Sequence, residues 1–566
     1  MKELIRRMFS RPVIAGELII ASAFISVLAL ASPLFVMQVL NRYLSQGIDA
    51  TLVTLVTGVL IAIALEFAMR QARLRLARGV NVMPDEAAAF SGFNVLSRAR
   101  MSALEQVPPE ARREIVNGVS ALESAYNANN ITTVLDVPFS LVFIFVLYLI
   151  NPEIALIAAG FLIMIFLTGI LSAMSLRNKT AELQQNSAQG SALLGTVSRE
   201  GDTVRAFNAS HFLRQAWQKN VRFAQRKRRD LTSAQALLQT FTQTANALMS
   251  VAVIALGATL VVIGELDSGA MIGANILAAR ALQPISKFSQ LGAGFAKARE
   301  ALKTFRQMAA VPLEADHGSA MANYRGGLEF RDAAFGFAGG TSPIFESLSL
   351  KVEPGSVLVV TGSNGAGKTT LARMIAGLLE PSRGQILVDG LDLQQIAPEW
   401  WRKQIIYLPQ EPSLLNATIK ENLRINNPDL DPAAMNEIVK AAGLRRFLDE
   451  SPSGFETPIV DNGWRLSEGI RRRIALGRAL ATGGNIAIID EPTESLDDEG
   501  TAAVHAILGS LVKRGCTVIV MSHDKNIVKG RHTVIDLDEK PVPAVRVVTP
   551  EIKQVAQQPA QTGTDS

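Results

Sequence analysis

The stretch VLVVTGSNGAGKTTLARMIAGLL at 357–379 decides the fold of the second half of the chain. An apolar strand leads into a glycine-rich loop that ends in Lys368 and Thr369 and opens an apolar helix, so the pattern G-x-x-x-x-G-K-[ST] has the context it requires. The glycines let consecutive backbone N–H groups converge on phosphate oxygens, and the helix N-terminus adds a favourable dipole. The sequence therefore predicts a nucleotide-phosphate site formed by Gly362, Ser363, Asn364, Gly365, Ala366, Gly367, Lys368, Thr369 and Thr370.

A pair of acids further along the chain supplies the second part of this chemistry. In NIAIIDEPTESLD at 485–497, an apolar strand ends in Asp490, at the edge where α/β sheets bind ligands. We expect Asp490 to hold Mg²⁺ together with the Thr369 hydroxyl, and Lys368 to neutralise the outer phosphates. Glu491 is the candidate general base, or the group that orients the attacking water.

The sequence around these motifs predicts an α/β domain. Strand-like runs at 356–362, 385–390, 486–492 and 516–523 alternate with helical stretches, which is typical of a parallel sheet with crossover helices. The last segment is rich in Pro, Gln and Thr, which is typical of a disordered tail. We assign a linker to 311–324, the nucleotide-binding domain to 325–540 and the tail to 541–566.

The composition indicates that much of the remaining chain lies in a membrane. Of the 566 residues, 48% are hydrophobic and only 19% are charged. The net charge of +5 is modest, and basic loops of a membrane protein account for such an excess, so we expect no nucleic-acid partner. Cys516 is the sole cysteine, which excludes an intrachain disulfide and a thiol metal cluster.

Four stretches of the first half are long and apolar enough to cross a bilayer, and two weaker ones complete the pattern. The weaker pair is 134–150, which contains Asp136, and 269–290, which contains Arg280; a buried core helix is the alternative for each. Counting all six predicts an all-α transmembrane domain over 1–310, with spans at about 13–40, 50–69, 134–150, 154–176, 245–264 and 269–290.

Basic connections alternate with short, weakly charged ones. The N-terminal segment 1–11 and the segments 70–113 and 177–230 carry the lysines and arginines, which places them, the N-terminus and the α/β domain in the cytoplasm. The first apolar run is too long for a cleaved signal peptide. Apolar residues recur at helical spacing in both long loops, so we expect the helices to leave the membrane and turn back, with coupling segments at 107–118 and 201–212.

Taken in order, these motifs resemble the nucleotide-binding domain of an ATP-binding cassette (ABC) transporter. Phe337 stands where the family stacks an aromatic ring on adenine, and a ring face serves for Phe as for Tyr. Gln410 matches the glutamine that senses Mg²⁺, His523 matches the histidine that reaches the γ-phosphate, and SLD at 495–497 matches a loop that contacts the opposite subunit. The resemblance implies ATP and Mg²⁺ as cofactors, with Glu491, His523 and Gln410 as catalytic residues and Thr369, Gln410 and Asp490 as metal ligands.

LSEGI at 466–470 stands where the family writes LSGGQ. Two cassettes of the family pack head to tail, so Ser467 and Gly469 would approach the γ-phosphate bound by the partner subunit. Glu468 fits poorly, because a carboxylate roughly 6 Å from a phosphate charge costs on the order of 3 kcal/mol per unit charge pair at an effective dielectric of about 20. It must point into solvent or be offset by the arginines at 471–473. Both a homodimer and a heterodimer with an intact partner signature stay open.

Six spans followed by one cassette resemble an ABC exporter half-transporter. The segments 32–52 and 135–156 are similar to the ATPase/permease of type I protein secretion, although Asn41 replaces the Asp of the family's Asp-Arg pair. The resemblance implies export of an unfolded polypeptide across the bacterial inner membrane, with a second half-transporter, a periplasmic membrane-fusion adaptor and an outer-membrane channel. Only 1–12 precede the first span, so we expect no N-terminal peptidase-like domain.

Two other functions stay open at this point. The cargo of the same ATPase could be a lipid or a small amphipathic molecule, which predicts stimulation by lipids and none by a secretion peptide. Alternatively, the chain could be the mainly regulatory half of a heterodimeric exporter, which predicts negligible turnover when it is purified alone. The acid at 491 and the histidine at 523 argue against a purely regulatory half.

Overall fold

The chain forms two compact units, and each is described by itself. One, the helical unit, comprises Met1–Ala99 and Leu104–Pro312; the other, the α/β unit, comprises Arg100–Ala103 and Leu313–Ser566. The computed structural model describes residues 2–44, 47–315, 317–337, 342–494, 496, 498–524, 527–528 and 530–549, without the side chains at 82, 83, 110, 111 and 113–117.

Prolines and asparagines start several helices of the helical unit. Pro12 and Pro152 occupy the first turn of their helices, where an N–H would lack a partner in any case. The Asn151 side chain accepts from the N–H groups of Glu153 and Ile154, which caps the second of these helices. The elements are α1 Lys2–Phe9, α2 Pro12–Leu28, α3 Ala31–Gln38, the π-helical η1 Val39–Tyr43, α5 Asp49–Arg98, α7 Pro109–Ala125, α8 Ala128–Ile150, α9 Pro152–Arg199, α10 Gly201–Ala206, α11 Ser210–Val262, α12 Ser268–Gln290 and α13 Gly292–Ala309. The short helix α6 Met101–Leu104 lies between α5 and α7 in the chain, and most of it belongs to the α/β unit.

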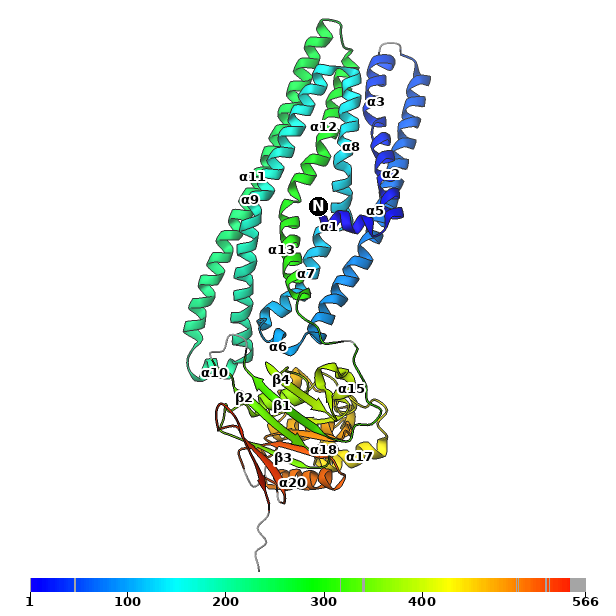
Figure 1. The fold of residues 1–566 in the computed structure, drawn as a ribbon. Coiled ribbons are helices and arrows are strands. Elements are labelled where there is room, and N and C mark those ends of the chain that lie inside the picture. Colours follow the sequence, from blue (N-terminus) through cyan, green and yellow to red (C-terminus); the bar gives the residue numbers. More distant parts are fainter. Residues whose placement is uncertain are drawn as a thin grey trace, which may run out of the picture. The chain divides into compact units, whose positions relative to one another are not determined.

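Three helices are far longer than a bilayer is thick. α5, α9 and α11 have 50, 48 and 53 residues, or roughly 75 Å each at about 1.5 Å per residue, against a hydrocarbon core of about 30 Å. α9 and α11 run side by side over most of their length (Figure 1). The amides of Asn186 and Asn220 each donate to the other residue's carbonyl, at 3.2 and 2.9 Å, which fixes the register of this pair. The helices therefore continue beyond the apolar spans, as the sequence predicts.

The short helices at the turns lie partly where the sequence predicts coupling segments. α10 falls within the predicted 201–212 segment. The predicted segment 107–118 instead runs into the long helix α7, and the short helix of that turn is α6, a few residues earlier.

Five stretches of the described residues are helical, long and apolar enough to cross a membrane, against the six that the sequence predicts. They are Pro12–Tyr43, Asp49–Arg98, Ala128–Ile150, Pro152–Arg199 and Ser210–Val262. The predicted sixth span, 269–290, is the helix α12, which is long enough but not apolar enough for this criterion. Its composition has a structural reason, because α12 packs inside the bundle and buries two Gly and four Ala residues beside Leu277, Leu282 and Ile285.

Small residues let α12 approach its neighbours closely. A Cβ atom at Gly269 would lie 2.2 Å from Asn41 Oδ1 and 2.7 Å from the Met37 carbonyl oxygen. A Cβ at Gly273, four residues on, would lie 2.1 Å from Met37 Cγ. This G-x-x-x-G spacing brings the backbone of α12 against α3 and η1, which is a common way for helices to associate in membranes. The Gly269 N–H also donates to Asn41 Oδ1 at 3.0 Å.

The α/β unit contains two sheets. A four-stranded antiparallel sheet has the order β2-β1-β4-β5, and a six-stranded sheet has the order β10-β9-β3-β8-β7-β6, parallel except for β10. The strands are β1 Leu328–Phe335, β2 Phe345–Val352, β3 Val357–Thr361, β4 Arg383–Val388, β5 Leu391–Asp392, β6 Ile405–Leu408, β7 Ile486–Asp490, β8 Thr517–Met521, β9 His532–Asp536 and β10 Ala544–Val548. The helices are α14 Lys368–Ile375, α15 Pro398–Arg402, α16 Ile419–Arg424, α17 Pro432–Ala441, α18 Arg445–Glu450, α19 Glu468–Ala481 and α20 Asp498–Lys513, with short 3-10 turns η2 Leu393–Gln395, η3 Gly454–Glu456 and η4 Asp461–Gly463.

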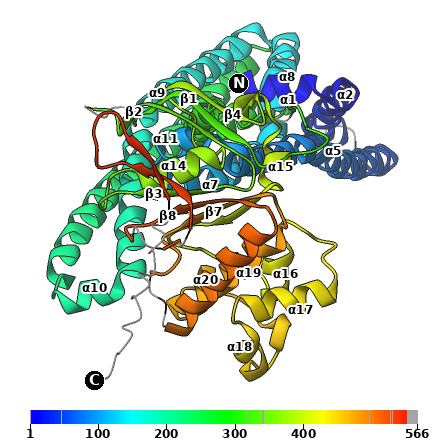
Figure 2. The same cartoon turned by 60° about the horizontal axis from the view of Figure 1, so that its bottom comes forward.

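Both faces of the parallel sheet are buried, which explains why its strands read as continuous apolar runs. Every residue of β3, β7 and β8 is buried. In β3, Val357 and Val359 face a core that includes residues of α16, α17, α19 and α20, whereas Leu358 and Val360 face a second core shared with the antiparallel sheet and α14. The helices α19, α20 and α16 lie on one side of this sheet (Figure 2). The predicted α/β class is confirmed.

The segment 541–566, expected to be a disordered tail, begins with a strand instead. β10 pairs antiparallel with β9 in register from Ala544 opposite Asp536 to Val548 opposite His532. Its β-branched residues favour a strand at the sheet edge, whereas the glutamines that suggested disorder all follow it, and 550–566 lie outside the described residues.

We predict that Gly269→Ala lowers the midpoint of thermal unfolding of the purified protein, because the new methyl group meets the Met37 carbonyl; overpacking of this kind costs about 1–3 kcal/mol. Gly160→Ala on α9 is the matched control, since its Cβ would meet nothing within 4 Å. That control should leave the midpoint unchanged or slightly raised. Equal midpoints for the two variants, measured in the same detergent, would contradict the close packing of α12.

Candidate functional site

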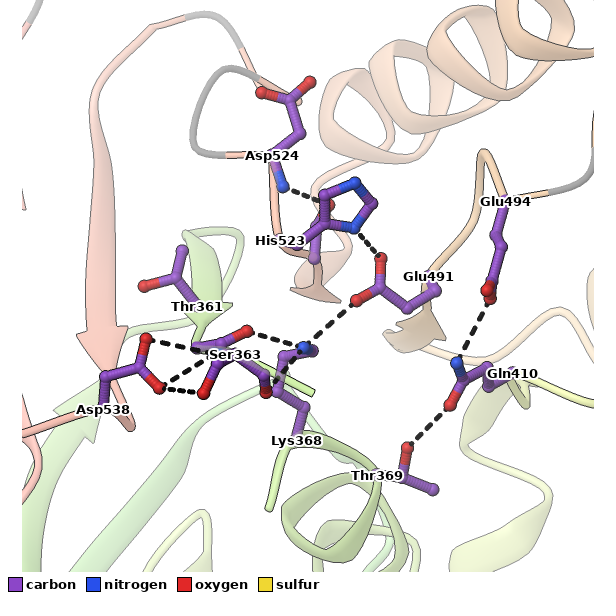
Figure 3. A network of polar contacts seen from close by, with 12 residues as sticks. Thr361, Ser363, Lys368, Thr369, Gln410, Glu491, Glu494, His523, Asp524 and Asp538 are labelled. Carbon is purple, nitrogen blue, oxygen red and sulfur yellow. Dashed lines mark hydrogen bonds and ion pairs between the residues drawn. The ribbon is translucent and has the colours of Figure 1, made fainter. Parts of the chain in front are cut away.

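The predicted site residues of the α/β unit gather at one edge of the parallel sheet. Gly362 follows β3, Gln410 follows β6, Glu491 follows β7 and His523 follows β8. Because these strands are parallel, their carboxyl ends meet at the same edge. Figure 3 shows the side chains of Lys368, Glu491 and His523 in one linked network.

The glycine-rich loop has a backbone that requires glycine. Gly365 and Gly367 have φ of +85° and +111°, in the left-handed region. A Cβ at Gly367 would also lie 2.4 Å from Ile344 Cγ2, so a side chain has no room there. α14 begins directly after this glycine, at Lys368, so its free N–H groups face the loop. Asn364 is exposed and Ala366 is buried, while Thr370 is half-buried in the first turn.

The Lys368 ammonium is folded back onto its own loop. Its Nζ donates to the carbonyl oxygens of Gly362 at 2.7 Å and Ser363 at 3.3 Å, and lies 3.3 Å from Glu491 Oε1. The two ionised side chains are only 8% and 5% exposed. Three oxygens therefore surround a buried cation at the head of a phosphate-type loop (Figure 3).

Glu491 is held in a strained backbone conformation. Its φ is +45°, in the left-handed region that few non-glycine residues adopt, and such strain concentrates at functional sites. Its N–H donates to the Met521 carbonyl at 2.9 Å. While Oε1 faces Lys368, Oε2 lies 3.0 Å from His523 Nδ1, and the His523 side chain is 70% exposed. The carboxylate thus joins a buried cation to an exposed imidazole.

The Asp490 carboxylate is suited to a metal ion. Asp490 is fully buried, and neither of its carboxylate oxygens has a hydrogen-bond partner among the described residues. Burial raises the pKa of this carboxyl, because the ionised form loses its water. The Thr369 hydroxyl donates to Gln410 Oε1 at 3.3 Å, so the three predicted ligands neighbour one another. A divalent cation would satisfy the two orphaned oxygens, and oxygen donors are those that Mg²⁺ prefers.

The signature segment caps a helix. The Ser467 hydroxyl accepts from the Ile470 N–H at 3.4 Å, at the start of α19. Gly469 meets nothing within 4 Å of an added Cβ, so this helix face is open. Phe337 is half exposed and packs edge-on against Phe335, with 5.1 Å between ring centroids. Ser495 and Asp497 of the predicted SLD loop lie outside the described residues.

Glu468 pairs with an arginine one turn further on. Of the three arginines at 471–473, Arg472 is the one in range, with Nε 3.6 Å from Glu468 Oε1. Arg471 lies over the Trp464 ring, and Arg473 donates to the Gly443 carbonyl.

Arg472 is buried and hydrogen-bonds to three residues of the site. Its Nη1 donates to the Glu491 carbonyl at 2.8 Å, and its Nη2 donates to the Gln410 carbonyl at 2.9 Å and to Glu494 Oε2 at 3.3 Å. Gln410 Nε2 also donates to Glu494 Oε2, at 3.2 Å. The sequence identifies Arg472 only as one of three arginines. Its spacing of four residues from Glu468 could have predicted their ion pair, because residues four apart are neighbours on a helix.

Two further residues brace the glycine-rich loop from the segment after β9. Asp538 accepts from the Ser363 N–H at 2.8 and 3.0 Å and from its hydroxyl at 2.7 Å, and these hydrogen bonds hold the pKa of Asp538 below its ordinary value. Lys540 Nζ donates to the carbonyls of Ala366, at 2.9 Å, and Ile344. Neither residue belongs to a motif, and only the pairing of β3 with β9 brings them to the loop.

Two family models match the chain. The ABC transporter family matches residues 345–494, and the ABC transporter transmembrane region matches residues 105–285; together they span more than half of the chain. Among solved structures, a bacterial Atm1-family ABC exporter with ATP bound is similar, with a TM-score of 0.79 and 20% sequence identity over 93% of this chain and 94% of that one. At this identity the likeness shows the fold alone.

Curated relatives are toxin translocation proteins. The chain is 29% identical to the alpha-hemolysin translocation ATP-binding protein HlyB of Escherichia coli O157:H7 and 26% identical to the toxin RTX-I translocation ATP-binding protein of Actinobacillus pleuropneumoniae. It is 27% identical to the leukotoxin translocation ATP-binding protein LktB of Mannheimia haemolytica. Each match covers 92% of this chain and 74% of the relative. The chain therefore belongs to the ABC transporters: it is a multi-pass membrane exporter half-transporter, related to the type I secretion ATPases, with an ATPase domain that drives transport.

Proposed function

We propose that this half-transporter exports an unfolded polypeptide across the bacterial inner membrane, driven by ATP that two such subunits bind between them. The juxtaposition of Lys368, Glu491 and His523 at the sheet edge is the observation that carries the ATP-dependent part. The similarity to three toxin translocation proteins over 92% of the chain supports a polypeptide cargo.

Binding of ATP requires Lys368 to exchange partners. The ammonium leaves the carbonyls of Gly362 and Ser363 and turns to the outer phosphates, which carry more charge than those neutral oxygens. The N–H groups from Gly365 to Thr370 then donate hydrogen bonds to the remaining phosphate oxygens. The exposed ring of Phe337 stacks on adenine. Release of Lys368 also frees Glu491 Oε1.

Mg²⁺ would be held by Asp490, the Thr369 hydroxyl and the Gln410 amide oxygen, and it supplies charge neutralisation of the β- and γ-phosphates. Thr369 Oγ1 lies 3.3 Å from Gln410 Oε1. Asp490 has the carboxylate whose oxygens lack a hydrogen-bond partner among the described residues. Gln410 is also tied to Glu494 and, through its carbonyl, to Arg472.

Hydrolysis follows from the position of Glu491. Its carboxylate orients a water molecule and takes a proton from it as the water oxygen attacks the γ-phosphorus, and the bond to the β–γ bridging oxygen breaks, leaving ADP and phosphate. His523, on the exposed side of the carboxylate, donates to the γ-phosphate. The signature of the second subunit closes the site with Ser467 and Gly469 at the open start of α19.

The ion pair with Arg472 reduces the repulsion that Glu468 would exert on the phosphate. The carboxylate is half exposed and shares a buried arginine with Glu494, so its charge at the phosphate is partly compensated. This arrangement supports a homodimer in which both sites hydrolyse ATP. A membrane-fusion adaptor on the periplasmic side and an outer-membrane channel complete the proposed export route, with the N-terminus and the α/β unit in the cytoplasm.

We predict that Glu491→Gln retains Mg-ATP binding and loses at least about 100-fold in ATPase rate, whereas Lys368→Ala also binds nucleotide weakly, since each removes a group that acts on the phosphates. Purified protein is assayed by phosphate release and by binding of a fluorescent ATP analogue. Glu437→Gln, an exposed acid on α17, is the control and should behave as wild type. Wild-type hydrolysis in the Glu491 variant would contradict its role.

We predict that Arg472→Met lowers the ATPase rate about 10–100-fold, the range for residues that orient groups in direct contact with the reaction. Loss of the guanidinium frees the Glu491 and Gln410 carbonyls and leaves Glu468 and Glu494 without their cation. Arg446→Met, a surface arginine paired with Glu450, is the control. The KM for ATP should change less than kcat, and a variant with wild-type kcat would show that Arg472 serves the fold alone.

A further inference from the structure

The helical unit encloses a cavity with an excess of positive charge. The cavity measures about 400 Å³ and lies between α2, α5, α8 and α12. Four basic side chains line it, Arg70, Arg73, Arg280 and Lys287, against a single acid, Asp136. Charges inside a membrane domain are expensive and mark sites of function by default.

Two of the four cations are neutralised by residues of the helical unit. Arg73 is buried and places both Nη atoms on Asp136, one of them at 3.2 Å, and its Nη1 also donates to Ser22 Oγ at 3.0 Å. Arg70 pairs with Glu66, its Nε and Nη2 lying 2.8 and 2.6 Å from Oε1. Arg73 therefore ties α5 to α2 and α8, whereas the pair of Arg70 and Glu66 lies within α5.

The other two cations, Arg280 and Lys287, are both on α12. They make no hydrogen bond or ion pair within the part of the chain that the structure describes. Arg280 lies about 18 Å from the start of α12 at about 1.5 Å per residue, near the middle of this helix. Arg280 is half-buried and Lys287 is exposed, and both side chains line the cavity.

A second polar cavity adjoins the first and extends it. It measures about 650 Å³ and shares Leu74 and Asn129 with the first cavity. Its lining includes the amides of Asn81 and Asn127 and three acids, Asp85, Glu86 and Glu123, against Arg78, so the excess of positive charge is confined to the first cavity. The two therefore form one polar cleft along α5 and α8. Amide side chains along such a cleft can hydrogen-bond to a peptide backbone, whereas a lipid headgroup would fill only a fraction of this volume.

We propose that Arg280 and Lys287 form an anion site that binds carboxylate side chains of the polypeptide cargo as it enters the helical unit. The inference rests on the proposed polypeptide export and adds to it a preference for acidic segments. Carboxylates that approach these two ammonium and guanidinium groups gain charge-assisted hydrogen bonds in a partly dry site. The same cavity would weaken the binding of basic segments.

The test compares two unstructured fluorescent peptides, one with Glu at alternate positions and one with Gln in their place. Binding to the full-length protein in phosphatidylcholine nanodiscs is measured by anisotropy. We expect the Glu peptide to bind at least about tenfold more tightly, the range of one charge-assisted hydrogen bond, and added salt to reduce the difference.

Variants localise the effect. Arg280→Gln and Lys287→Gln should abolish the preference for the Glu peptide, and Arg280→Lys should keep it. Arg177→Gln on α9 removes an exposed arginine outside the cavity and should also keep it. A preference that survives both Gln variants would overturn the proposal, and the Lys variant guards against loss by misfolding.

Other outcomes separate this site from the proposed function. If both peptides bind equally tightly, the proposal of an anion site is rejected and the proposal of polypeptide export is kept. If neither peptide binds or stimulates the ATPase, polypeptide export itself fails. If phosphatidylglycerol displaces the Glu peptide from wild type but has no effect on the variants, the cations serve a lipid phosphate, and the proposal for the cargo is overturned.

Discussion

The arrangement of the candidate nucleotide site depends on the contact between the Lys368 ammonium and the three oxygens that surround it. Lys368 is buried, so its charge needs partners, and it takes two loop carbonyls and the Glu491 carboxylate. These partners are weaker for Lys368 than a triphosphate would be, and neither carboxylate oxygen of Asp490 has a hydrogen-bond partner among the described residues. A charged but incompletely satisfied edge of the sheet is thus suited to an anion with its cation, and we propose this as the physical basis for driving the exporter with Mg-ATP.

Much of this site could be predicted from the sequence, because its parts lie in motifs with local geometry. The loop 362–368 needs glycine at left-handed positions, and the apolar strands before Asp490 and His523 place those residues at the same sheet edge. Their roles in catalysis stay predictions until they are measured. Arg472, Asp538 and Lys540 could not be assigned from the sequence, since their contacts depend on which helix face turns inward and on the pairing of strands far apart in the chain.

Less of the helical unit than of the candidate site could be predicted from the sequence. Hydropathy finds helices that face lipid, but α12 owes its place to small residues that pack against α3 and η1, and its mean hydropathy is correspondingly low. The composition of 541–566 likewise concealed β10, because five strand residues were averaged with a longer polar stretch. The sequence places Arg280 in a predicted span, yet only the fold shows that Lys287 lines the same cavity and that, among the described residues, neither cation forms an ion pair.

The most direct test of the account is the distance between two copies of the α/β unit with and without nucleotide. Cys516 is the sole cysteine, so Cys516→Ser with Glu437→Cys gives one spin label on each copy in a Glu491→Gln background. Electron–electron double resonance should show a single shorter distance when ATP and Mg²⁺ are added, and no change when Lys368→Ala is introduced as well. Identical distance distributions with and without Mg-ATP in the Glu491→Gln protein would contradict the claim that ATP is bound between two subunits.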